Sequence, residues 1–233
     1  MTPRGGGQIR TEMFLFEKSL NTDSYVYFHL LSGQDICIKP QNFVHEFFDK
    51  NRGKEFLSFS GKDWQDRAQS RVKYYHIECG RNRIKRLANK VFVKVQKILH
   101  IDRRKKCGLI FVGGSNWVSI TENFCRYLVD NKKFILKTFK KTYCADELFV
   151  HTMAYNSEFK KDIYMINEKE LNDDADIDMC YANMRKIDWV RGKPYTFDCD
   201  DFDDIINSPF IFIRKVDDSN GLSDKILQYL NLY

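Results

Sequence analysis

Short apolar segments rich in β-forming residues alternate with amphipathic helical segments along this chain. The first apolar segment, residues 25–31, is aromatic and ends in a polar turn at 32–35; Pro40 then opens a helix that runs to about Lys50. This alternation predicts an α/β fold, in which ligands bind at the carboxyl ends of strands. Further helices are expected over 8–20, 82–100, 122–128, 145–155, 200–207 and 222–231. Further strands are expected over 56–59, 72–77, 109–112 and 210–213.

The composition fits a globular protein. Hydrophobic residues make up 43% of the 233 residues and aromatic residues 15%, which excludes an intrinsically disordered chain. With 4 Pro, 12 Gly and no low-complexity linker, the sequence predicts a single domain over 1–233. No apolar run reaches the ~20 residues that span a bilayer, and the first residues do not resemble a signal peptide. The seven cysteines form no CxxC pair, which favours reduced thiols and a cytoplasmic protein.

Positive charge is concentrated between residues 81 and 106, a segment that contains eleven Lys or Arg residues and only one acidic residue, Asp102. The helix expected over 82–100 is amphipathic, with its apolar residues on one side and most basic residues elsewhere. Such a helix could make peripheral contact with an anionic membrane, or it could be an ordinary solvated face, which we favour. Nucleic-acid binding is not expected, because the net charge is only +6 and no recognition motif accompanies the basic run.

Two groups of charged residues could carry chemistry. Asp146 and Glu147 lie in the first turn of an expected helix, where a carboxylate either complements the helix dipole or stays ionised as a general base. Arg191 precedes a glycine, and Lys215 follows the apolar strand 210–213. A guanidinium and an ammonium group suit a diphosphate when no metal is present, although each residue could instead be a surface cation.

Five short motifs, in order along the chain, resemble those of one known family. The motif at 32–39 is similar to "GQD-x-P-I-K", 114–121 to "GSNWFSLT", 145–147 to "PDE", 189–192 to "W-x-RG" and 214–217 to "ARKFD". These belong to the core-2/I-branching β-1,6-N-acetylglucosaminyltransferases, glycosyltransferase family 14, which also includes peptide O-xylosyltransferases. The likeness runs from Gly6 to near the C-terminus. Each motif alone is weak, whereas the ordered set is specific.

The resemblance implies a GT-A-like α/β/α sandwich with a mostly parallel central sheet. It implies an inverting, metal-independent transfer of N-acetylglucosamine from UDP-GlcNAc to the hydroxyl of a glycan or glycolipid, with no cofactor and no metal. The alternatives are xylosyl transfer from UDP-xylose and a truncated, non-catalytic remnant. Carried over motif by motif, Glu147 would be the catalytic base, and Arg191 and Lys215 would bind the donor diphosphate. Four further residues would line the cleft: Asp35, Lys39, Ser115 and Trp117.

The sequence departs from the family pattern in two ways. Cys37 and Ala145 replace prolines, and Ile213 and Val216 replace Ala and Phe, but no charged group is lost. Family members normally begin with a strand–helix–strand unit that binds uracil and ribose, whereas residues 5–12 here are similar to the later "WGG-x-SQI-x-AE". Roughly 60 to 70 residues, about one βαβ unit, are therefore expected to be missing.

Aspartates also form four DxD patterns, which in many glycosyltransferases bind a metal and the nucleotide. Two of them overlap at 174–178 and are interpreted as an acidic loop. The other two, at 198–200 and 201–203, precede or begin an expected helix, where acids complement the helix dipole. A metal role for any of them is not expected.

Overall fold

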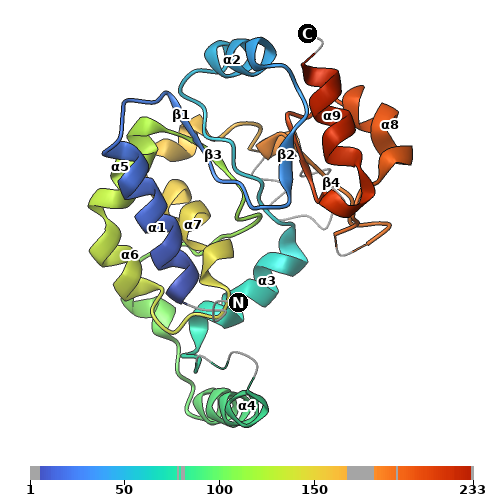
Figure 1. Cartoon of the computed structure of the whole chain (residues 1–233). Coiled ribbons are helices and arrows are strands. Elements are labelled where there is room, and N and C mark those ends of the chain that lie inside the picture. The colour runs from blue at the N-terminus through green and yellow to red at the C-terminus, as the bar shows by residue number, and fades with distance from the viewer. Residues whose placement is uncertain (1–5, 78, 80–81, 167–180, 193, 232–233) are drawn as a thin grey trace.

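The computed structural model of this chain describes residues 6–77, 79, 82–166, 181–192 and 194–231. Its elements form two lobes (Figure 1). The larger lobe contains helices α1 (Gly6–Leu20), α3 (Lys62–Lys73), α5 (Glu122–Asp130), α6 (Lys132–Thr138) and α7 (Phe149–Tyr155), with strands β1 (Tyr27–His29) and β3 (Ser119–Thr121). The smaller lobe contains strands β2 (Asp35–Cys37), β4 (Arg185–Ile187) and β5 (Phe212–Arg214), with helices α8 (Phe202–Ile206) and α9 (Leu222–Leu230). Helix α2 (Gln41–Lys50) lies at the top of the molecule in the view of Figure 1, and its buried residues Val44 and Phe48 share a hydrophobic cluster with residues of both lobes.

The helices of the larger lobe form because their apolar residues recur at helical spacing. Helix α1 buries Ile9, Met13 and Phe16, which share one face and pack into the main hydrophobic core. Helix α5 buries Phe124 and Leu128 in the same core. Thr121 is the N-cap of α5: its side chain accepts a hydrogen bond from the backbone N–H of Phe124 at 3.2 Å.

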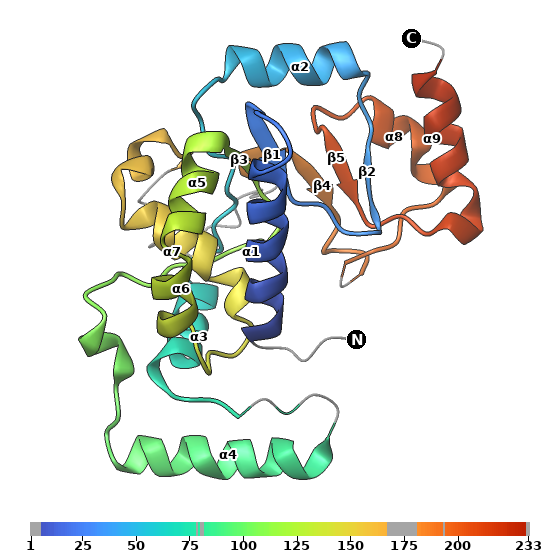
Figure 2. The ribbon, with the colours of Figure 1, turned by 60° about the vertical axis from the view of Figure 1, so that its left-hand side comes forward.

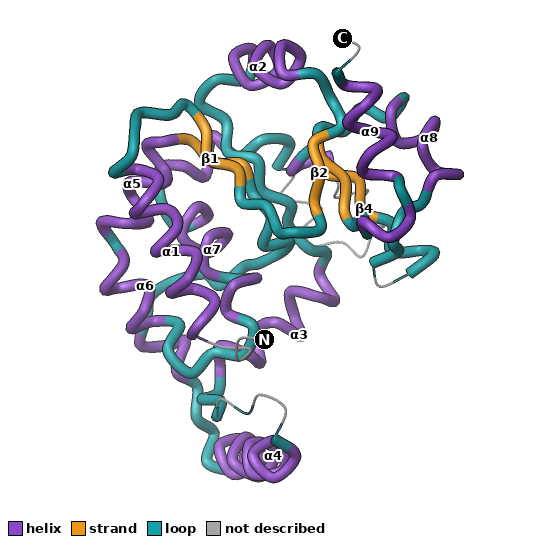
Figure 3. Tube along the Cα trace, viewed as in Figure 1, coloured by secondary structure: helices purple, strands orange, loops and turns teal. Residues whose placement is uncertain are grey.

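The strands are short and form two small sheets (Figure 3). Strands β1 and β3 pair antiparallel, with Phe28 opposite Ile120. In the second sheet, β5 lies between β2, which is antiparallel to it, and β4, which is parallel to it. The α/β class is confirmed. The pairings differ from the expected mostly parallel sheet, because among the described strands only β4 and β5, joined by a crossover through α8, run in the same direction.

Three expected strands are absent from the described structure: 56–59, 72–77 and 109–112. Residues 72–77 were expected to form a strand, but α3 continues to Lys73. The apolar pattern of the sequence did not predict α3, because only one of its three buried residues is strongly apolar: Gln65, Ala68 and Val72. Helix α6 and strand β4 were not predicted either. Residues 56–59, expected to form a strand, form only isolated β-bridges.

The segment 109–112 has the composition of a strand but bonds to side chains instead. Asn156 accepts from the backbone N–H of Ile110 at 2.9 Å and donates to its carbonyl at 2.7 Å. The hydroxyl of Thr152 accepts from the N–H of Val112 at 3.3 Å and donates to its carbonyl at 2.9 Å. Side chains from α7 and its C-cap therefore take the place of a neighbouring strand.

Helix α4 (Arg83–Ile98) lies apart from the rest of the molecule, at the bottom of Figure 2. The helix itself was predicted, and its apolar side faces solvent. In the described part of the chain, no helix is both long and apolar enough to cross a membrane.

A buried ionic cluster joins the strands of the smaller lobe to the larger one. The carboxylate of Asp35 accepts a hydrogen bond from Arg214 at 2.7 Å and lies 3.8 Å from the guanidinium of Arg185. Arg185 is fully buried and also donates to the carbonyl of Leu30, just after β1, at 3.1 Å. Burial lowers the pKa of Arg185 to about 10, so it stays charged at neutral pH.

Neutralising this carboxylate should be costly. Asp35→Asn would leave two guanidinium groups in the interior without a counter-charge, and we expect the free energy of unfolding to fall by about 3 to 5 kcal/mol. The matched control is Asp49→Asn, because Asp49 forms an exposed ion pair with Arg52; its effect should stay below about 1 kcal/mol. Urea unfolding of both variants measures the difference. Equal losses in the free energy of unfolding would show that the buried cluster stabilises the fold no more than an exposed ion pair does.

A second buried carboxyl group, Glu55, makes stability depend on pH. Glu55 accepts hydrogen bonds from the backbone N–H and the hydroxyl of Thr121 at 2.9 and 2.5 Å, and burial raises its pKa from 4.5 to about 7. Between these pH values the native state holds more protons than the unfolded state, so the free energy of unfolding falls as the pH rises.

The variant Glu55→Gln removes this dependence while keeping an acceptor and a donor for Thr121. The wild type should lose about 3 kcal/mol more than the variant between pH 4.5 and pH 7. Urea unfolding across this range measures the difference. Parallel curves for the two proteins would mean that Glu55 titrates normally.

Candidate functional site

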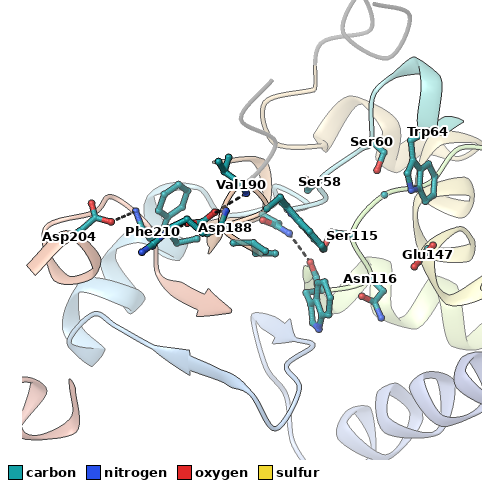
Figure 4. Close-up of a pocket in the computed structure, with 17 residues that line it drawn as sticks. Ser58, Ser60, Trp64, Ser115, Asn116, Glu147, Asp188, Val190, Asp204 and Phe210 are labelled. Atoms are coloured by element: carbon teal, nitrogen blue, oxygen red, sulfur yellow. Dashed lines mark hydrogen bonds and ion pairs between the residues drawn. The ribbon is translucent and has the colours of Figure 1, made fainter. Parts of the chain in front are cut away.

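A cavity of about 820 Å³ is lined by residues of both lobes. Figure 4 shows Trp64 and Glu147 on one side of it and Asp188, Val190 and Phe210 on the other. Its size is that of a pocket for a small organic ligand. The larger lobe contributes Ser58, Ser60, Trp64, Gly114, Ser115, Asn116, Trp117 and Glu147. The rest of the lining consists of Asn183, Lys186, Ile187, Asp188, Trp189, Val190, Arg191, Asp204 and Phe210.

Two glycines let the loop before β3 pass between neighbouring backbones. The N–H of Gly114 donates to the carbonyl of Glu147 at 2.9 Å, and the N–H of Ser115 donates to the carbonyl of Ser58 at 3.0 Å. A Cβ atom on Gly114 would lie 1.9 Å from the carbonyl oxygen of Ser58, and one on Gly113 would lie 2.4 Å from that of Glu147. The glycines of this motif are therefore required for close packing, and they fix the backbone of Glu147 against the loop.

Glu147 lies at the cavity wall, at the end of the short 3₁₀ helix η2 (Ala145–Glu147). Its carboxylate forms an ion pair with Arg71 of α3, and the guanidinium of Arg71 lies 5.0 Å from the ring centroid of Trp64. About a third of the Glu147 side chain stays exposed. The carboxylate is thus held in a defined place and remains accessible from the cavity.

The neighbouring carboxyl group, Asp146, has a different environment. It is buried and accepts a hydrogen bond from Gln8 of α1 at 3.0 Å. Burial, together with the negative charge of Glu147, raises the pKa of Asp146 to about 6. Glu12, also on α1, is buried as well, and burial and the charge of Asp146 raise its pKa. Asp146 therefore belongs to the contact with α1, and Glu147 is the member of the pair that faces the cavity.

Arg191 lies on the opposite wall, in a tight turn after β4. The carboxylate of Asp188 accepts from the backbone N–H groups of Val190 and Arg191 at 2.8 and 2.9 Å, and from Nε of Arg191 at 2.5 Å. Nη1 of Arg191 donates to Asp201 at 2.6 Å, and its guanidinium lies 4.0 Å from the ring centroid of Tyr195. Two carboxylates and one aromatic ring thus orient this guanidinium, and its side chain is still 44% exposed.

Of the predicted site residues, Glu147, Arg191, Ser115 and Trp117 line one cavity. Lys215 does not line it; it is half-buried just after β5, and its backbone pairs with Tyr195 and Phe197.

Asp35 and Lys39 do not line this cavity either, so their predicted place in the cleft has to be revised. Asp35 is buried between two arginines, as described above. The ammonium group of Lys39 donates to the carbonyl of Ile206 in α8 at 2.7 Å, which ties β2 to that helix. Asp35 supports the cavity wall indirectly, because Arg214, which binds Asp35, lies 3.9 Å from the ring centroid of Trp117.

Sequence reasoning missed Trp64 and Arg71 because it did not predict α3. The two residues are seven positions apart, two helical turns, and so share one face of that helix. The signal was present in Gly61 as N-cap, Asp63 in the first turn and basic residues in the last turn. It also missed Lys186 and Asp204, which form an ion pair of 2.9 Å at the cavity wall.

Asp198 and Asp201, two aspartates of the C-terminal DxD patterns, have structural partners. Asp198 caps the 3₁₀ helix η5 (Cys199–Asp201) by accepting from the N–H of Asp200 at 3.0 Å, and Asp201 completes a capping box and binds Arg191. This agrees with the prediction that these acids stabilise the start of a helix. The patterns at 174–178 lie outside the described residues. Within the described ranges, no group of three His, Cys, Asp or Glu side chains is placed to hold a metal ion.

The glycine loop provides a test of the packing. Gly114→Ala should lower the free energy of unfolding by at least about 2 kcal/mol, because a Cβ atom there meets backbone rather than a movable side chain. Gly33→Ala is the matched control, since a Cβ at Gly33 meets nothing within 4 Å; its effect should stay within about 0.5 kcal/mol. Thermal or urea unfolding compares the two, and a tolerated Gly114→Ala would contradict the close approach.

Comparison with known proteins adds the following. A family model described as "Core-2/I-Branching enzyme" matches residues 2–203. Xylosyltransferase sqv-6 of Caenorhabditis elegans is 28% identical over 230 residues, which cover 91% of this chain and 26% of that protein. Xylosyltransferase oxt of Drosophila pseudoobscura pseudoobscura is 24% identical over 196 residues, covering 79% of this chain and 21% of that protein. Xylosyltransferase 2 of Homo sapiens is 23% identical over 215 residues, covering 89% of this chain and 23% of that protein.

The chain thus spans about a quarter of the length of the curated relatives it matches. Its mixed α/β architecture is consistent with a GT-A-like fold. Residues of three of the five family motifs line one cavity. Because the family model covers most of the sequence, this chain belongs to the core-2/I-branching enzyme family.

Proposed function

We propose that this chain carries the catalytic base and part of the donor site of an inverting glycosyltransferase that uses a UDP-sugar. One observation carries the proposal: Glu147 and Arg191, from two family motifs far apart in the sequence, line opposite sides of one cavity. Family membership supports the reaction type, and the accessible carboxylate supports the role of a base.

In the proposed reaction, Glu147 takes the proton from an acceptor hydroxyl. The hydroxyl oxygen forms a bond to the anomeric carbon, while the bond from that carbon to the diphosphate breaks and UDP leaves with the electron pair. A single displacement of this kind inverts the anomeric centre and needs one base and no covalent intermediate. The ion pair with Arg71 and the hydrogen bond from Gly114 to the Glu147 carbonyl support the proposal, because they hold the carboxylate in place.

Arg191 is proposed to bind the diphosphate. A guanidinium group matches phosphate oxygens with paired donors, and it stabilises the negative charge that develops on the leaving group. Asp188 and Asp201 hold Arg191 at the wall without burying it, which supports this role. The family resemblance implies that Lys215 also binds the diphosphate and that the reaction needs no metal ion. We include both statements in the proposal. The proposal depends mainly on Arg191, because Lys215 lies outside the cavity lining.

The sugar donor is proposed to be UDP-xylose. The curated relatives named above are all xylosyltransferases by name. Transfer of N-acetylglucosamine from UDP-GlcNAc is the alternative that the sequence motifs suggested. The acceptor is proposed to be a hydroxyl group of a protein or glycan. Trp64, Trp117 and Trp189 in the lining offer flat apolar surfaces against which a sugar ring could pack.

Two variants test the two roles separately. Glu147→Gln should lower the rate of transfer by roughly 10²- to 10⁴-fold and leave UDP binding unchanged, because it removes the base but does not touch Arg191 on the opposite wall. Arg191→Met should weaken UDP binding by roughly tenfold or more, the contribution of a charge-assisted hydrogen bond. Glu46→Gln, an exposed site on α2, is the control and should change neither.

Calorimetric titration with UDP and transfer assays with UDP-xylose and UDP-GlcNAc, each with and without EDTA, measure these effects. Transfer confined to one donor identifies the sugar, and full loss of transfer in EDTA would overturn the metal-free mechanism. A wild-type chain that binds no UDP would be the non-catalytic remnant, and the proposed function would fail.

A further inference from the structure

Helix α4 exposes its apolar side. Six apolar side chains face solvent with exposed fractions between 46% and 79%: Ile84, Leu87, Val91, Val95, Ile98 and Leu99. Successive residues of a helix are rotated by about 100°, so these positions form one continuous strip, which we call the α4 strip. In a globular protein such a strip normally faces the core. Here the helix presents it outward.

The opposite side of α4 is the side attached to the protein, and it is polar. Gln96 is buried, and its amide accepts from the backbone N–H of Tyr75 at 2.8 Å and donates to the carbonyl of Tyr75 at 2.9 Å. Asn89, about two turns earlier, accepts from the backbone N–H of Ile77 at 2.8 Å. These hydrogen bonds fix the orientation of α4 about its own axis. Because Gln96 and Asn89 face the protein, the α4 strip on the opposite side faces outward.

Positive charge borders the strip. Helix α4 contains six Lys or Arg residues and no Asp or Glu. Arg83, Lys90 and Lys94 lie along one edge of the strip, and Lys85 lies beyond the other edge. An apolar strip bordered by cations is complementary to the surface of an anionic lipid bilayer, where apolar side chains enter the acyl boundary and cations meet the headgroups. A second protein chain would need acidic residues to match this border, and this chain offers none on α4 itself.

The position of α4 suits contact with a flat surface. Figure 2 shows the helix lying along one end of the molecule, with no other labelled element beyond it. Helix α4 and its border are also distant in the fold from helices α2 and α9, which lie at the opposite end (Figure 1). The protein can therefore lie on a membrane through α4 without burying other elements.

We propose that α4 is an interfacial helix that docks this protein on membranes rich in anionic lipid, with the α4 strip in the lipid and Arg83, Lys90 and Lys94 at the headgroups. The proposal is independent of the proposed transferase activity.

Vesicle flotation of the full chain tests this docking. The vesicles contain phosphatidylcholine with about one-third phosphatidylserine, and pure phosphatidylcholine vesicles serve as the neutral comparison. The wild type should float with the anionic vesicles and dissociate when salt is raised from about 0.1 M to 1 M, because the Debye length falls from about 10 to 3 Å. Equal binding to neutral vesicles, or no binding to either, would overturn the proposal.

Matched variants separate the two components of the surface. Leu87→Gln, Val91→Gln and Ile98→Gln together remove apolar contact and keep every charge, and they should abolish flotation. Arg83→Gln, Lys90→Gln and Lys94→Gln together should weaken binding roughly 100-fold, which corresponds to about 1 kcal/mol per cation. The control carries the same loss of charge at the other end of the molecule: Lys18→Gln, Lys50→Gln and Lys225→Gln.

The control should bind the anionic vesicles within about twofold of the wild type; a loss as large as in the α4 variants would mean that net charge, not α4, controls binding. All substituted side chains are exposed, and circular dichroism checks that each variant is folded. Light scattering tests the alternative that a second copy of the chain covers the α4 strip. The proposal would be overturned if the wild type is a dimer that binds no vesicles and the apolar variant is a monomer.

Discussion

The carboxylate of Asp35 lies between the guanidinium groups of Arg185 and Arg214, and much of the structure depends on this contact. It holds together the strands β2, β4 and β5, and Arg185 continues to the carbonyl of Leu30 in the larger lobe. Burying two positive charges is unfavourable unless a negative charge accompanies them. The lobes are thus joined by an interaction that requires all three residues at once.

The same contact supports the wall of the cavity. Arg214 lies against the ring of Trp117, and Asn183 donates to the carbonyl of Trp117 at 3.1 Å. Trp117 belongs to the loop whose glycines fix the backbone of Glu147. The position of the proposed base is therefore connected, through a short chain of packed groups, to the junction of the lobes. Arg191 is held separately, by Asp188 and Asp201.

The sequence predicted elements well where apolar spacing was strong, as in α1, α2, α5 and α9. It failed for α3, whose buried face includes a glutamine that donates to the carbonyl of Gly113 at 2.6 Å. Polar residues with buried partners cannot be recognised by hydropathy, because their partners are distant in sequence. For the same reason the pairing of Glu147 with Arg71 could not be foreseen. Asp35, expected to line the cleft, has a structural role instead.

The segment 109–112 has a consequence for solubility. A run of Leu-Ile-Phe-Val without charge or proline is the type of sequence that templates intermolecular β-sheet when its backbone is free. In this fold Thr152 and Asn156 occupy the N–H and carbonyl groups of Ile110 and Val112. Helix α7 thereby protects an aggregation-prone edge with two polar side chains, a task that other proteins give to a charged or shortened edge strand. Loss of those two side chains would leave the backbone groups of Ile110 and Val112 without these partners.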